Sequence, residues 1–141
     1  MMKDVIINIK GRQGLGDELD TIELTTDGRF VEKNGSYYMT YDESAMLGLE
    51  NVKTALYIKP GNSVILQRSG DVESRLVVEE GKRSTCYYNT PQGELLIGIF
   101  GESVKTELNS GGGKIHMKYT IDSNLNLISR NTVDISVKGA E

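Results

Sequence analysis

The chain has 141 residues and a mass of 15.6 kDa, and its 16 basic and 20 acidic side chains give a formal net charge of −4. A nucleic-acid surface ordinarily carries an excess of Lys and Arg, and a membrane-spanning helix needs about 20 apolar residues in a row. The sequence has neither feature, so we expect one domain over residues 1–141 that buries its own core and contacts neither nucleic acid nor membrane.

The first residues, MMKDVIINIK, begin a strand-like pattern without the charged and apolar segments of a secretion signal. Cys86 is the single cysteine, which excludes an internal disulfide. Both features favour a soluble protein of the reducing cytoplasm.

Alternation of side-chain type with a period of two dominates the chain, and it predicts about ten β-strands. The strand-like segments span residues 5–10, 21–26, 29–33, 36–41, 52–59, 63–69, 72–78, 83–88, 94–100, 114–121 and 127–138. Turn-forming residues separate them at 27–28, 34–35, 60–62, 69–71, 80–81, 91–93 and 111–113. Connections this short favour an antiparallel meander, which stacks as a sandwich or closes into a barrel. We expect closure, because it removes the exposed strand edges.

The first glycine-rich segment, GRQGLGD at residues 11–17, resembles a phosphate-binding loop only loosely. No lysine follows its last glycine, no helical pattern comes after it, and Asp17, Glu18 and Asp20 would repel an anion. We therefore expect a flexible loop that does not bind a nucleotide.

A hairpin around Asn34-Gly35 is the clearest local prediction. Asn-Gly tolerates positive φ at both central positions of a type I′ turn, so Lys33 should face Ser36 and the pairing should continue outward from there. One side of the ribbon is the more apolar and is expected to be buried; it carries Phe30, Tyr37, Met39 and Tyr41.

Residues 42–51, DESAMLGLEN, are the one segment with helical potential. Gly48 in its middle lowers that potential, so we expect a crossing loop.

The strand at 63–69 places Arg68 on the same side as Val64 and Leu66. If that side is interior, the guanidinium needs a carboxylate or a bound anion as its partner. A salt bridge to Glu43 or Glu102 and a contact to a ligand are the two alternatives.

The strand at 114–121 has an apolar side that includes Tyr119 and a mixed side that carries His116, the single histidine. One histidine cannot build a multi-histidine metal site, so we expect His116 to be exposed. Cys86 has no activating base near it in sequence and is expected to be half-buried and structural. No metal or cofactor is predicted.

Several segments in this order and spacing resemble the YwiB-like family, small bacterial proteins of unknown function with a lipocalin-like, calycin-type β-barrel. They are YDESAMLGLE, VILQRSG, YYNTPQGELLIGIF and GGGKIHMKYTID, and the resemblance covers nearly the whole chain. Gly101 departs from it, standing where the pattern has threonine. The resemblance implies architecture rather than activity. Barrels of about eight to ten strands are either filled by side chains or hold one small ligand.

Three functions are open at this point. In the first, a small, partly apolar acid enters the barrel and meets Arg68, with Tyr41, Tyr88 and Tyr119 as walls and Glu43 completing the candidate set. In the second, the interior is filled and the protein is a structural or protein-interaction module, with a homo-oligomer as one form. An enzyme is the weakest hypothesis, because one histidine and one cysteine do not supply an activated nucleophile or a bound metal.

Overall fold

The computed structural model describes residues 2–15, 18–42, 51–70, 73–90 and 93–139. Its regular structure is all β, and no helix in these ranges is long and apolar enough to cross a membrane. The ten described strands are β1 (Lys3–Leu15), β2 (Glu18–Lys33), β3 (Ser36–Asp42), β4 (Val52–Lys59), β5 (Ser63–Gly70), β6 (Glu73–Glu79), β7 (Arg83–Thr90), β8 (Gly93–Asn109), β9 (Gly112–Ser123) and β10 (Asn126–Gly139).

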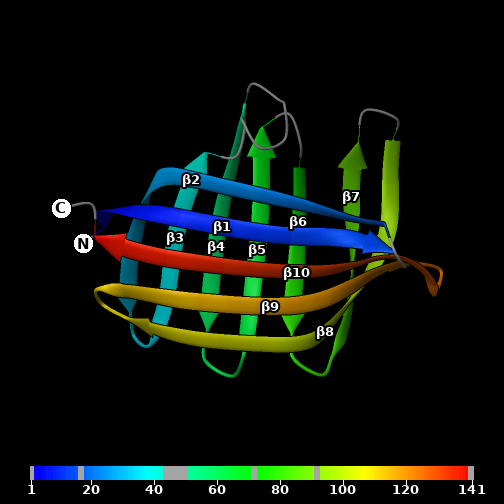
Figure 1. Cartoon of the computed structure of the whole chain (residues 1–141). Helices are drawn as coiled ribbons and strands as arrows, with labels where there is room; N and C mark the ends of the chain where they lie inside the picture. Colours follow the sequence, from blue (N-terminus) through cyan, green and yellow to red (C-terminus); the bar gives the residue numbers. More distant parts are fainter. Residues whose placement is uncertain (1, 16–17, 43–50, 71–72, 91–92, 140–141) are drawn as a thin grey trace.

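The ten strands form one closed antiparallel barrel, as the alternation of the sequence predicts. Each strand pairs with its neighbours in the chain, and β1 closes the ring by pairing with β10. In Figure 1 the long strands β1, β9 and β10 run crosswise to the shorter strands β3 to β7 behind them. The barrel is therefore built from two layers that cross, and β2 and β8 belong to both.

The predicted turn at Asp27-Gly28 is wrong, because β2 continues through it as one strand. Gly28 pairs with Val5 of β1 and with Tyr41 of β3, so β2 passes from one layer to the other at this point. A Cβ on Gly28 would collide with the Ile7 side chain and lie 2.6 Å from the Thr40 carbonyl oxygen. The glycine thus permits a tight barrel corner rather than a reversal of the chain.

A second corner lies in β8, where residues 98–100 pair with both β7 and β9. The ladder shifts between Gly101 and Ser103, and a Cβ on Gly101 would collide with the Glu79 carbonyl oxygen. The prediction ended this strand at Phe100, whereas β8 continues to Asn109.

The predicted flexible loop at 11–17 is also wrong over its first part. Residues 11–15 belong to β1, where Gly11 pairs with Ile22 and Val133. Residues 16–17 lie outside the described ranges, as do residues 43–50 of the predicted crossing loop.

The Asn34-Gly35 hairpin is confirmed. Both residues have positive φ, 55° and 80°, and the ladder runs from Lys33–Ser36 outward to Gly28–Tyr41. Its apolar side faces the core as predicted. Tyr37 stacks on Phe30 with ring centroids 5.7 Å apart, and the Tyr37 hydroxyl donates to the Leu108 carbonyl 2.8 Å away.

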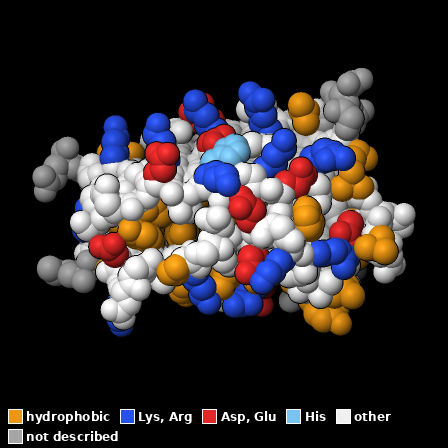
Figure 2. Space-filling view, turned by 90° about the horizontal axis from the view of Figure 1, so that it is seen from below, with side chains coloured by type: hydrophobic (Ala, Val, Ile, Leu, Met, Phe, Trp, Pro, Cys, Tyr) orange, Lys and Arg blue, Asp and Glu red, His pale blue; other side chains and the backbone are white. Residues whose placement is uncertain are grey.

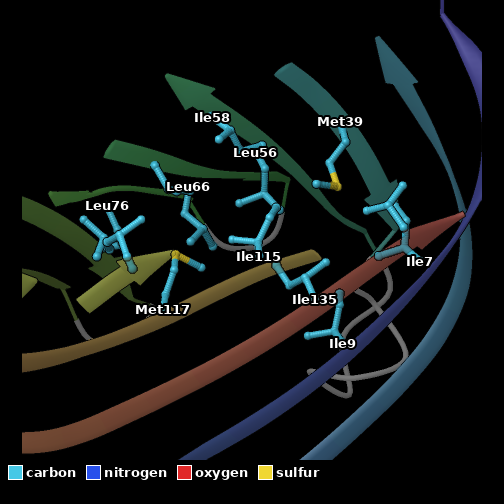
Figure 3. Close-up of a cluster of buried hydrophobic side chains, with 14 of the residues drawn as sticks. Ile7, Ile9, Met39, Leu56, Ile58, Leu66, Leu76, Ile115, Met117 and Ile135 are labelled. Carbon is cyan, nitrogen blue, oxygen red and sulfur yellow. The ribbon is translucent and has the colours of Figure 1, made fainter. Parts of the chain in front are cut away.

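The barrel interior is packed with aliphatic side chains and methionines from nearly every strand. Figure 3 shows Leu56, Leu66, Ile115 and Met117 pointing toward one another between the two layers. The largest fully buried side chains are Phe30, Ile7, Met39, Leu56, Ile99, Ile115, Met117, Val5, Val52, Val64 and Val78. Most of the lumen is therefore filled.

The seam between β6 and β7 has the shortest ladder of the described barrel, with pairs at Glu73–Asn89 and Ser74–Tyr88 alone. Further along the seam a side chain makes a bond in place of the ladder: the Ser84 hydroxyl donates to the Val77 carbonyl at 2.9 Å. The two strands thus separate after their first two pairs.

Candidate functional site

One row of cross-strand neighbours in the barrel is polar, and its members on β3 to β6 face the interior. Tyr41 pairs with Thr54, Thr54 with Arg68, Arg68 with Ser74, and Ser74 with Tyr88, across strands β3 to β7. Residues directly opposite in antiparallel strands lie about 4.5–5.5 Å apart between Cα atoms, so the row is continuous. We call these five residues the polar row.

Strand alternation explains why Arg68 and Ser74 point inward. Arg68 comes two residues after the buried Leu66, and Ser74 comes two residues before the buried Leu76. Side chains two residues apart in a strand share a face, so each polar residue extends an apolar face by one step toward the end of its strand.

The polar row is well shielded from solvent. Tyr41 is 5% exposed, Thr54 1% and Ser74 6%, while Arg68 is half-buried. A charged guanidinium in such a place is costly unless it is paired or hydrogen-bonded. The Arg68 guanidinium has five N–H donors, so it can hold an anionic group in addition to the interaction that it already makes.

Three of the five predicted site residues line one interior cavity of about 50 Å³. They are Tyr41, Arg68 and Tyr119, and the cavity wall beside them is apolar, with Leu56 and Met117. A single water occupies about 30 Å³ of liquid, and pockets for drug-sized ligands measure about 300–1,000 Å³. The cavity thus has room for a carboxylate or a short aliphatic chain, or for one or two waters.

Arg68 also lines a groove on the outside of the barrel, with a volume of about 290 Å³. Ser74, Arg75 and Tyr87 line the same groove. Arg68 therefore borders both the interior cavity and a surface depression at the adjoining ends of β5 and β6.

The Ser74 hydroxyl stands out in this row. Within the described part of the chain, it is a fully buried side-chain oxygen without a hydrogen-bond partner. A buried polar group that makes no hydrogen bond costs about 1–3 kcal/mol, so native proteins carry few of them.

The two other predicted site residues are placed only in part. Tyr88 belongs to the polar row through its backbone, which pairs with Ser74 and Leu95, and its side chain is not described. Glu43 lies outside the described residues. Glu102, the other predicted partner of Arg68, forms an ion pair with Arg130 at 3.6 Å.

Polar groups continue inside the barrel on β10, which the sequence analysis did not single out. Asn131 pairs with Tyr119 across β9 and β10, and its side-chain amide donates to the Ser129 hydroxyl at 3.0 Å. Both residues are buried, at 5% and 4% exposure. Ser129 and Asn131 stand at even spacings before the buried Ile135, so strand alternation could have shown that they share its inward face.

The remaining titratable candidates lie away from the cavity. The Nδ1 atom of His116 lies 2.6 Å from the carboxylate of Asp134 on the outer surface, where Figure 2 shows charges of both signs around the histidine. Cys86 is half-buried, and burial raises the pKa of its thiol. In the described ranges no three His, Cys, Asp or Glu side chains gather as they would around a metal.

Arg83 and Asp122 form a further polar cluster, outside the barrel. The Arg83 guanidinium donates to both carboxylate oxygens, at 3.1 and 2.7 Å, and crosses over Gly98, where a Cβ would collide with it. The carboxylate also accepts the backbone N–H of Leu125 at 3.2 Å. This cluster fastens β7 to the turn between β9 and β10.

These features define a ten-stranded antiparallel β-barrel with a filled apolar core and a polar layer at one level of its interior. A family model described as a domain of unknown function, DUF1934, matches residues 7–135, and the chain belongs to that family. The resemblance to YwiB-like proteins seen in the sequence is thereby confirmed.

Two comparisons with individual proteins agree. The chain is 29% identical over 100 residues to the uncharacterized beta-barrel protein YwiB of Bacillus subtilis (strain 168), which covers 71% of this chain and 68% of that protein. The crystal structure of the ywiB protein from Bacillus subtilis superimposes with a TM-score of 0.84 at 22% identity, over 99% of this chain and 94% of that one. The structural likeness supports the fold.

Proposed function

We propose that this protein binds a small organic acid inside a lipocalin-like barrel, as a cytoplasmic small-molecule-binding protein. The observation that carries the proposal is the convergence of Arg68, Tyr41 and Tyr119 on one interior cavity beside an apolar wall. Arginine is suited to this task, because its planar guanidinium binds both oxygens of a carboxylate.

The cavity wall sets the class of acid. Leu56, Leu66 and Met117 offer apolar contacts next to Arg68, so the acid group would lie at the polar row and a short aliphatic chain would lie against these residues. A cavity of about 50 Å³ favours the smallest acids. We therefore expect a short-chain monocarboxylate rather than a fatty acid.

Methionine methyl NMR tests this directly, because the described strands contain two buried methionines at different places. Met117 lines the cavity, whereas Met39 is packed in the core and is not part of the cavity wall. Titration of protein labelled with ¹³C at the methionine methyls with acetate, propionate, butyrate and octanoate should shift the Met117 signal and leave that of Met39 in place.

Arg68→Met should weaken this binding at least tenfold, because the bidentate partner of the carboxylate is lost. Arg130→Met is the matched control, since Arg130 is an exposed arginine whose ion pair lies on the outer surface. Equal affinity in wild type and Arg68→Met would remove the arginine from the proposal.

A second candidate function is protein interaction by a filled barrel. Two observations favour it: the interior cavity is small, and large apolar side chains are exposed near one end of the barrel. They are Leu15, Leu19, Tyr87, Leu95, Leu96, Leu125, Leu127 and Ile128. Figure 2 shows apolar patches toward its right-hand end. The methionine titration separates the two candidates, because a filled barrel predicts that neither methyl signal moves.

A further inference from the structure

We infer that Ser74 contacts the acid directly, so that its hydroxyl and the Arg68 guanidinium together hold the carboxylate of a short-chain monocarboxylate. This inference rests on the proposed function and assigns the second half of the binding centre. It starts from the contrast between Ser74, whose buried hydroxyl lacks a partner in the described chain, and the well-satisfied polar groups around it.

Register places the two groups next to each other. Arg68 and Ser74 are directly opposite in the β5–β6 ladder, and both belong to the inward-facing polar row. A carboxylate has two oxygens with about four acceptor positions, so it can accept from the guanidinium and from the hydroxyl at once. Bound in this way, it would give the Ser74 hydroxyl the hydrogen bond that the described part of the chain does not supply.

The position of the outer groove also supports the role of Ser74 in binding the acid. Arg68 and Ser74 both line the outer groove of about 290 Å³, which Arg75 and Tyr87 border on its surface side. An acid can therefore approach Arg68 from solvent without parting the packed core, and it reaches the buried Ser74 hydroxyl by displacing a side chain of the groove. Two arginines, Arg68 and Arg75, and one carboxylate, Glu73, line this groove, so its net positive charge favours an anion along this path.

The inference predicts opposite effects of Ser74→Ala on stability and on binding. Removal of a hydroxyl that makes no hydrogen bond should raise the melting temperature of the ligand-free protein, by about 2–5 °C. The same change should weaken butyrate binding at least fivefold in the methionine titration. If the Ser74 hydroxyl served only to stabilise the fold, its removal would not raise the melting temperature and weaken butyrate binding together.

Ser84→Ala is the matched control, because the Ser84 hydroxyl already donates to the Val77 carbonyl at 2.9 Å. That variant should melt at a lower temperature than wild type and bind butyrate with unchanged affinity. The two serine-to-alanine changes, on adjacent strands, thus compare a hydroxyl that has a partner with one that has none in the described chain.

The outcomes separate this inference from the proposed function. If butyrate and the other acids leave Met117 unmoved in wild type, the proposed function fails and the assignment of Ser74 falls with it. If Arg68→Met loses binding and Ser74→Ala keeps it, the function stands and the role of Ser74 is overturned, with a bound water as the partner of its hydroxyl. A lower melting temperature for ligand-free Ser74→Ala would also overturn it, because it would show that the hydroxyl supports packing.

Discussion

Asp122 illustrates how strongly a single side chain depends on its neighbours across the sheet. Asp122 comes two residues after Thr120 and therefore shares the outer face of β9 with it, yet Asp122 is only 8% exposed. Arg83, Gly98 and the backbone of Leu125 together enclose the carboxylate. The hydrogen bonds from the Arg83 guanidinium lower the pKa of this carboxyl from its ordinary 3.8, although burial opposes them.

This lowered pKa makes a prediction about acid. A carboxyl whose pKa is lower in the folded protein stabilises the fold above its ordinary pKa, and that contribution is lost as the pH falls through the folded value. Wild type should therefore have a higher urea midpoint than Asp122→Asn at pH 7, and the difference should shrink below pH 3.8. A difference that stays constant down to pH 2 would contradict the role of the ion pair.

The positions of Ser74 and Thr54 opposite Arg68 could not be predicted from sequence. Alternation placed Arg68, Tyr41 and Tyr119 on inward faces, and the structure brings those three to one cavity. The residues opposite Arg68 depend on the register of β4 with β5 and of β5 with β6. Register is set by the length and geometry of the intervening connections, which composition does not specify.

The corners of the barrel are the features that decide the shape of its strands. Gly28 lies where β2 passes between layers, and Gly98 begins the corresponding segment of β8. Dipeptides such as Asp-Gly favour turns in sequence, but a glycine also serves wherever two backbones approach closely. The sequence therefore predicted a turn at Asp27-Gly28 within β2 and an early end of β8, and both predictions were wrong, whereas the type I′ hairpin at Asn34-Gly35 was predicted correctly.

Gly28→Ala tests the corner. The new methyl group would meet the Ile7 side chain and the Thr40 carbonyl, so we expect a loss of about 1–3 kcal/mol in the free energy of unfolding, measured in urea. Gly11→Ala is the control within a neighbouring strand, because no atom lies within 4 Å of a Cβ added there. That variant should be neutral or more stable by up to about 1 kcal/mol, and equal losses in both would refute the steric account.

For the whole molecule, the sequence predicted an antiparallel meander closed into a barrel, and the structure confirms it. The prediction succeeded because period-two alternation and short connections are local properties that together permit few topologies. The degree to which the lumen is filled was left open, since it depends on how side chains from opposite layers interdigitate. Buried residues such as Phe30, Met39 and Met117 occupy most of that space.

Closure of the ladder between β1 and β10 brings the first and last strands into contact, with Val5 opposite Gly139. The start of β1 and the end of β10 lie side by side in Figure 1. A circular permutant that joins these ends with a short Gly-Ser linker and opens the exposed β8–β9 turn between Ser110 and Gly111 should regain the wild-type circular dichroism spectrum. Because the ladder is a closed ring, we expect the strands to assemble whichever of them the ribosome makes first, and an aggregated permutant would show that their order of synthesis matters.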